Sequence, residues 1–75
     1  MTENSIAFIG GGNMASSLIT GLLENGYPRI KICASDTDAD ARRKLEEHQK
    51  IATQDDNSLV ARDADIVVLA VKPQI

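Results

Sequence analysis

Residues 6–15 read IAFIGGGNMA and join a short apolar run to three consecutive glycines and the start of a helix. The apolar run, residues 5–9, is bounded by glycine and is typical of a buried strand. Across residues 14–25, apolar side chains recur at helical spacing along one wide face. Gly26 then stands where a left-handed residue ends a helix, and Pro28 prevents the helix from resuming. The stretch therefore predicts a strand, a glycine loop and an amphipathic helix in direct succession.

The rest of the chain alternates strands with helices. The predicted elements are a strand at 30–34, a charged helix from about 37 to 48, a very short strand at 51–53, a short helix at 57–62 and an apolar strand at 66–71. We expect a Thr37–Asp40 capping box to open the charged helix, with Ala41 and Leu45 on its inner face. Gly21 in the first helix is expected to mark close packing of that helix on the sheet. The last strand is apolar throughout, which is typical of a strand buried on both faces.

This order of elements predicts an α/β fold: a Rossmann-type, doubly wound parallel sheet covered by helices. Right-handed crossovers give the strand order 3-2-1-4, with a crevice between the ends of the first and fourth strands where dinucleotides bind. A complete sheet of this type has further strands. We therefore expect residues 1–75 to be the N-terminal part of a NAD(P)-binding Rossmann domain that is truncated before the rest of the domain.

Composition and charge narrow the classes of partner. The 75 residues are 43% hydrophobic and 25% charged, as in an ordinary globular protein, and their net charge is −3. An acidic chain argues against nucleic acid or an anionic membrane as the main partner. The single cysteine, Cys33, cannot form an internal disulfide, and no signal peptide or membrane span is recognisable. These features predict a soluble, cytoplasmic protein.

The glycine loop matches the pattern G-x-G-x-x-[GA] in the strand-to-helix context that this pattern requires. Gly10 permits the tight turn, Gly12 lets a pyrophosphate approach the backbone, and Ala15 lets the helix pack closely on the strand. The first N–H groups of the helix then face the phosphates. Asn13 either caps the helix or hydrogen-bonds the pyrophosphate or a ribose. Met14 is expected to offer its backbone N–H to the cofactor and its side chain to the core.

The end of the second strand bears on the choice between NAD and NADP. Asp36 stands 24 positions after Gly12, near the expected place for an acid that binds the ribose 2′-hydroxyl and repels a 2′-phosphate. Ser35 can instead donate to a phosphate. Arg42 and Arg43 follow on the next helix, where we interpret both as surface charges. The cofactor is therefore predicted to be NADP or NAD, with the preference open.

Two motifs together resemble those of pyrroline-5-carboxylate reductases: the loop of residues 6–15 and the string LAVKPQ at residues 69–74. The resemblance implies an oxidoreductase that reduces the ring C=N bond of 1-pyrroline-5-carboxylate with NAD(P)H, which is the last step of proline biosynthesis. Hydroxyacid dehydrogenases of the 6-phosphogluconate type share the glycine loop but generally lack the second motif. A nucleotide-binding or regulatory module without catalysis is a further alternative.

The resemblance also implies roles for particular residues. It places Ala70, Val71, Lys72 and Pro73 near the nicotinamide, and it places Ser35 and Asn57 around the adenosine ribose and its 2′-phosphate. Alternatively, Asn57 or Asp56 caps a helix. Lys72 and Pro73 can likewise be explained as the solvated end of a strand. In the resembled family a later helical domain supplies the substrate site and most homo-oligomer contacts, so we assign no catalytic residue here. We also expect no metal site, and no catalytic role for His48 or Cys33.

Overall fold

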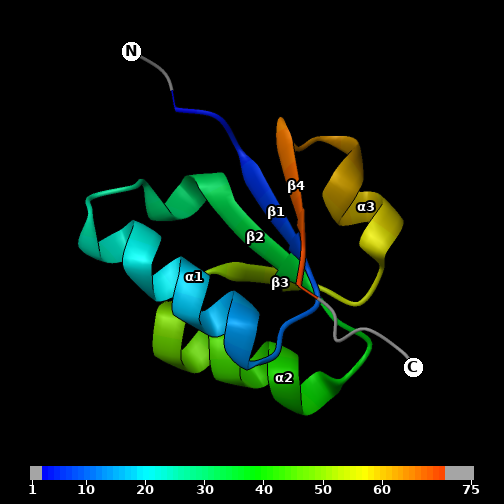
Figure 1. The fold of residues 1–75 in the computed structure, drawn as a ribbon. Helices are drawn as coiled ribbons and strands as arrows, with labels where there is room; N and C mark the ends of the chain where they lie inside the picture. The colour runs from blue at the N-terminus through cyan, green and yellow to red at the C-terminus, as the bar shows by residue number, and fades with distance from the viewer. Residues whose placement is uncertain (1–2, 71–75) are drawn as a thin grey trace.

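A computed structural model describes residues 3–70, apart from the side chains of Asn57 and Leu59. Its centre is a parallel four-stranded sheet in the order β3-β2-β1-β4, which confirms the predicted topology (Figure 1). The strands are β1 (Ile6–Ile9), β2 (Ile32–Ser35), β3 (Ala52–Gln54) and β4 (Ile66–Leu69). The helices are α1 (Asn13–Glu24), α2 (Ala39–Lys44) and α3 (Asn57–Arg62), with a 3₁₀ turn η1 (Arg29–Lys31) and a π-helical turn η2 (Leu45–Gln49) that continues α2.

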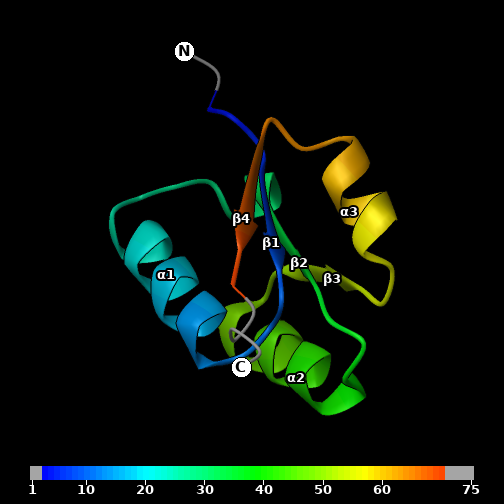
Figure 2. The same cartoon turned by 45° about the vertical axis from the view of Figure 1, so that its right-hand side comes forward.

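Two apolar layers hold the helices on the sheet. The β1 strand is buried along its whole length and alternates between the two layers, as the two-residue period of a strand requires. Ile6 and Phe8 join the core under α1 and η2, whereas Ala7 and Ile9 join Val60 under α3. The helices α1 and α2 therefore lie on one face and α3 on the other (Figure 2).

The α1 helix ends as the sequence predicts. Gly26 adopts a left-handed φ of 85°, and its N–H donates to the Leu23 carbonyl at 3.1 Å. The Tyr27 N–H donates to the Leu22 carbonyl at 3.0 Å. These two bonds form a Schellman motif, which satisfies carbonyls that the helix itself cannot pair.

The second strand begins two residues later than predicted. Ile30 fits the strand pattern, but it lies in η1 and its side chain is 92% exposed. The Lys31 N–H donates to the Pro28 carbonyl at 3.0 Å, and this turn takes the chain into β2 only at Ile32.

The start of α2 also differs from the prediction, whereas its inner face agrees. Asp38 is the N-cap, and its carboxylate accepts the Asp40 N–H at 2.9 Å, so the expected Thr37–Asp40 capping box is wrong. Leu45 is 2% exposed and lies in the core as predicted. The helical stretch ends after Gln49, where Lys50 has a left-handed φ of 60°.

Contrary to its prediction, β4 is not buried on both faces. Ile66, Val67 and Leu69 are 41%, 45% and 71% exposed. An apolar sequence predicts burial only where neighbours exist, and β4 is an edge strand that pairs with β1 alone. An open apolar groove of about 370 Å³ runs between β4 and α1, and Leu18 and Gly21 are among the residues that line it.

Gly21 lies beside this groove and does not mark close packing, because a Cβ atom built on it meets nothing within 4 Å. Glycine in a helix interior costs about 0.5–1 kcal/mol relative to alanine. We therefore expect Gly21→Ala to raise the melting temperature by about 4 °C. The matched control is Gly26→Ala, which also has free space but a φ of 85°, and it should lower the melting temperature. Thermal denaturation followed by circular dichroism checks both, and destabilisation by Gly21→Ala would contradict this account.

Candidate cofactor-binding site

The glycine loop leaves the sheet at the carboxyl ends of the strands, between β2 and β4. The Gly10 N–H donates to the Ser35 carbonyl at 2.7 Å on one side. On the other side, the Ala70 N–H donates to the Ile9 carbonyl at 2.8 Å. The loop therefore starts beside the point between β1 and β4 at which the strand order changes direction. α/β sheets of this type bind ligands at this point.

Each of the three consecutive glycines meets a different requirement. Gly10 has a φ of 105°, which strongly favours glycine. A Cβ on Gly11 would lie 3.1 Å from Cδ1 of Leu45, so a side chain there meets the protein itself. Gly12 has an ordinary φ of −82°, and a Cβ there meets nothing within 4 Å. Neither backbone strain nor a clash with the protein requires glycine at position 12, and the open space leaves room for a ligand to approach the backbone closely.

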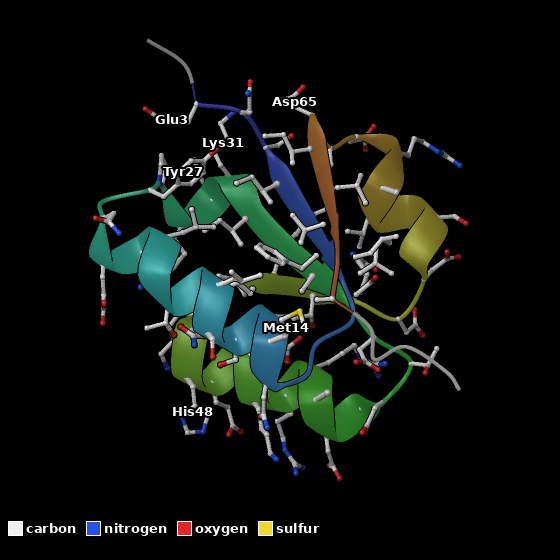
Figure 3. The ribbon with its side chains drawn as sticks, in the orientation of Figure 1. Glu3, Met14, Tyr27, Lys31, His48 and Asp65 are labelled. Atoms are coloured by element: carbon white, nitrogen blue, oxygen red, sulfur yellow. The ribbon has the colours of Figure 1, made fainter. Side chains whose placement is uncertain are left out.

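The first turn of α1 offers its N–H groups outward. Gly12 is the N-cap, no side chain caps the helix, and the first turn contains no acidic residue. Asn13 is therefore the first helical residue and not the cap. Met14 is 57% exposed and lies on the first turn of α1, which corrects its predicted place in the core (Figure 3). An uncapped helix N-terminus with a partial positive charge suits an anion such as pyrophosphate.

Ser35 and Asp36, at the end of β2, differ in their exposure and in their contacts. Ser35 is only 1% exposed and already has a polar interaction within the protein. Asp36 is half-buried, and its Oδ2 accepts the Gly11 N–H at 2.7 Å. The acid therefore contacts the glycine loop directly, which the sequence did not predict.

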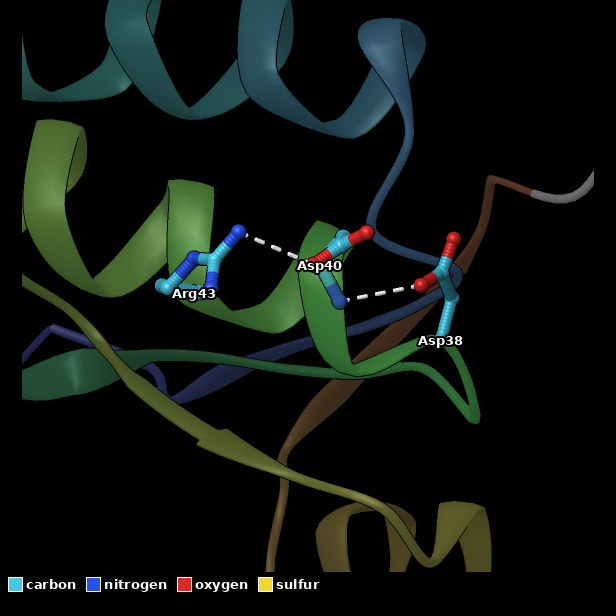
Figure 4. A network of polar contacts seen from close by, with 3 residues as sticks. All are labelled: Asp38, Asp40 and Arg43. Atoms are coloured by element: carbon cyan, nitrogen blue, oxygen red, sulfur yellow. Dashed lines mark hydrogen bonds and ion pairs between the residues drawn. The ribbon is translucent and has the colours of Figure 1, made fainter.

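The two neighbouring arginines have different partners. Arg43 pairs with Asp40 at 2.9 Å, with both side chains largely exposed, and Asp38 caps the same helix (Figure 4). This arrangement confirms Arg43 as a surface charge. Arg42 instead reaches back and donates from Nη1 to the Asp36 carbonyl at 2.7 Å.

The remaining candidate residues are placed only in part. Ala70 is 7% exposed and follows β4 beside the end of β1. Val71, Lys72 and Pro73 lie outside the described residues. Asn57 begins α3, but Asp56 is the N-cap and its carboxylate accepts the Ser58 N–H at 2.8 Å.

A groove of about 330 Å³ opens on the α2 side of the glycine loop. It is lined by Gly11, Gly12, Asn13 and Ser16 from the loop and α1, and by residues of α2 and η2 that include Lys44 and His48. His48 is exposed and points away from the sheet (Figure 3). Among residues 3–70, no three or more His, Cys, Asp and Glu side chains gather as a possible metal site. No helix in that range is long and apolar enough to cross a membrane.

Cys33 lies half-buried in β2, next to the carbonyl of Ile6 at 3.8 Å. Burial raises the pKa of its thiol, so the thiolate, which is the nucleophilic form, is disfavoured at neutral pH. The environment of Cys33 thus supports a structural role.

The parallel sheet, its strand order and the glycine loop together define a dinucleotide-binding α/β protein. The chain belongs to the family described as NADP oxidoreductase, coenzyme F420-dependent, whose sequence model matches residues 5–75.

Individual relatives are more specific. The chain is 49% identical over 74 residues to a pyrroline-5-carboxylate reductase of Pseudomonas aeruginosa, covering 99% of this chain and 27% of that protein. It is 45% identical over 75 residues to the enzyme of that name from Vibrio alginolyticus, covering 100% of this chain and 28% of that protein. A solved pyrroline-5-carboxylate reductase from Coxiella burnetii has a TM-score of 0.90 and 43% identity, covering 96% of this chain and 27% of that one.

These comparisons confirm the resemblance that the two motifs indicate, and they support binding of NAD(P). The chain spans only about a quarter of the length of the relatives it matches, as the 27% and 28% coverages show.

Proposed function

We propose that this chain binds NAD(P)H through its glycine loop as the cofactor-binding part of a pyrroline-5-carboxylate reductase. One observation carries the proposal: the free space at Gly12, beside an uncapped helix N-terminus. The space leaves room for a ligand to approach the backbone at Gly12, and a pyrophosphate fits the N–H donors of the helix N-terminus there. The relatives named for this activity support the substrate class.

In this proposal the cofactor supplies a hydride for the C=N carbon of 1-pyrroline-5-carboxylate when it is bound. The chain contributes binding and orientation, which are the protein's usual share in a cofactor enzyme. The N–H groups of Asn13 and Met14 face the pyrophosphate. We assign residues 70–73 to the nicotinamide half of the cofactor, and Ser35, Asp36 and Asn57 to its adenosine ribose.

The relatives are between three and four times as long as these 75 residues, as the 28% and 27% coverages show. We propose that a C-terminal helical domain supplies the substrate site and the contacts of a homo-oligomer, and that the protein works in the cytoplasm. The 75-residue part alone binds cofactor without catalysing the reaction.

The test is NAD(P)H oxidation by the full-length gene product in the presence of 1-pyrroline-5-carboxylate, followed by the absorbance of the reduced nicotinamide. We expect oxidation that depends on this substrate and yields proline. If the gene product binds NAD(P)H but does not oxidise it with this substrate, the reductase assignment fails and a binding module without catalysis replaces it. Oxidation of a hydroxy acid, with the oxidised cofactor as acceptor, would instead favour a hydroxyacid dehydrogenase of the 6-phosphogluconate type.

The ribose end of the site gives a prediction about cofactor preference. Asp36 has a carboxylate near the proposed ribose, which accepts from a 2′-hydroxyl and repels a 2′-phosphate. We expect Asp36→Ser to shift the ratio of NADH to NADPH affinities toward NADPH by about tenfold. Calorimetric titration with each cofactor measures the ratio, and an unchanged ratio would exclude this role of Asp36.

A further inference from the structure

The carboxylate of Asp36 joins two segments that are far apart in sequence. Its Oδ2 accepts the Gly11 N–H at 2.7 Å, across 25 positions of the chain. Its Oδ1 accepts the Asp38 N–H at 2.8 Å within the following turn. Hydrogen bonds to a charged acceptor are the strong ones in proteins. The side chain thus fastens the middle of the glycine loop to the segment between β2 and α2.

The backbone N–H and carbonyl of Asp36 are also hydrogen-bonded. Its N–H donates to the Gln54 carbonyl at 3.1 Å, which ties it to the end of β3. Its carbonyl accepts Nη1 of Arg42 at 2.7 Å. The carboxylate that accepts the Gly11 N–H therefore belongs to a residue whose own backbone is held by two hydrogen bonds.

Close packing holds Gly11 in the same place. A Cβ on Gly11 would lie 3.1 Å from Cδ1 of Leu45 and 3.4 Å from Cβ of Asp36. Leu45 is 2% exposed, and a Cβ on Gly11 would require its side chain to shift by a few tenths of an ångström. Position 11 is the variable one in the G-x-G-x-x-[GA] pattern, but in this chain glycine alone fits without displacing a neighbour.

We propose that Asp36 is a positioning residue for the pyrophosphate loop, acting through a clamp formed by Gly11, Asp36, Arg42 and Leu45. The Asp36 clamp holds the loop in its binding conformation before the cofactor arrives, which removes the entropy cost of ordering it. This inference rests on the proposed function and adds to it. Because every dinucleotide has the pyrophosphate, the clamp contributes equally to NADH and NADPH binding, whereas the 2′ position affects only their ratio.

Two substitutions separate the acceptor of Asp36 from its charge. Asp36→Asn and Asp36→Ala both remove the negative charge, but only asparagine keeps an oxygen that can accept the Gly11 N–H. With that oxygen on Gly11, both variants lose the acceptor of the Asp38 N–H, so the two differ in the Gly11 contact. We expect Asp36→Ala to bind both NADH and NADPH about three- to tenfold more weakly than Asp36→Asn. Calorimetric titration of the chain with each cofactor measures these affinities. Equal affinities of the two variants, or a difference confined to one cofactor, overturn the proposal.

The contact itself is measurable without cofactor. In ¹⁵N-labelled protein, the Gly11 amide should exchange slowly with solvent in the wild type and in Asp36→Asn, and faster in Asp36→Ala. An amide whose exchange is the same in all three proteins overturns the clamp. A wild-type chain that binds neither cofactor instead overturns the proposed function, and the Gly11 amide still reports on the contact.

The neighbouring arginines provide a charge-matched control. Arg42→Ala removes the bond to the Asp36 carbonyl, whereas Arg43→Ala removes only an exposed pair with Asp40. We expect Arg42→Ala to weaken both cofactors by two- to threefold, about the effect of one loosened hydrogen bond, and Arg43→Ala to leave them unchanged. Equal losses in the two variants would assign the effect to net charge and overturn the clamp.

Discussion

Gly12→Val is expected to abolish detectable binding of NADH and NADPH while the fold persists. A valine side chain fills the space that is open at Gly12, and this is the space that the proposed pyrophosphate needs. Loss of two charge-assisted hydrogen bonds to the phosphates alone corresponds to a weakening of about 100-fold. The measurement is calorimetric titration of wild type and variant with each cofactor.

The fold should tolerate this substitution for a structural reason. Gly12 has a φ of −82°, which any residue adopts, and its Cβ position contacts no protein atom within 4 Å. The cost of valine at an N-cap is about 1 kcal/mol at most. Circular dichroism should therefore show a native spectrum. Cofactor affinity that is unchanged in a folded Gly12→Val would remove the pyrophosphate from this loop.

Phe8→Ala is expected to have the largest effect on stability. Phe8 is 1% exposed at the centre of the sheet and belongs to the main core cluster. Replacing a buried phenylalanine by alanine costs about 3–5 kcal/mol, whereas the whole stability of a 75-residue domain is about 4–11 kcal/mol. We expect the melting temperature to fall by about 15 °C or more, or the variant to be unfolded at room temperature.

Ile30 offers the control for Phe8, since its side chain is 92% exposed. Ile30→Ala should change the free energy of unfolding by no more than about 0.5 kcal/mol. Urea denaturation of the two variants compares them directly. Similar losses at both positions would mean that β1 does not form the centre of the core.

The topology and the glycine loop were predictable because they depend on local patterns. The apolar run before three glycines, the helical spacing after them and the left-handed Gly26 each act within a few residues. Alternation of strands and helices, together with the glycine loop after the first strand, then favours the parallel order 3-2-1-4. The predicted sheet and the end of α1 are accordingly confirmed.

The features that sequence reasoning missed depend on a local turn in one case and on contacts between distant segments in the others. Ile30 fits a strand by its pattern, but the turn after Pro28 places it in solvent. The apolar character of β4 predicts burial that its edge position does not provide. Asp36 was expected at the ribose, and nothing in its local sequence shows that its carboxylate reaches Gly11. The one sign of this contact in the sequence was Gly11, because the pattern requires glycine only at positions 10 and 12 and leaves position 11 variable.

A titration of the ¹⁵N-labelled chain with NADPH, followed residue by residue through its amide resonances, tests most directly whether the glycine loop binds the cofactor. We expect saturable shifts that are largest for residues 10–15 and for residues 35 and 36, where the loop meets the end of β2. Shifts that are absent, or that gather instead around Leu18 and Ile66 in the apolar groove, would contradict a cofactor site at the glycine loop.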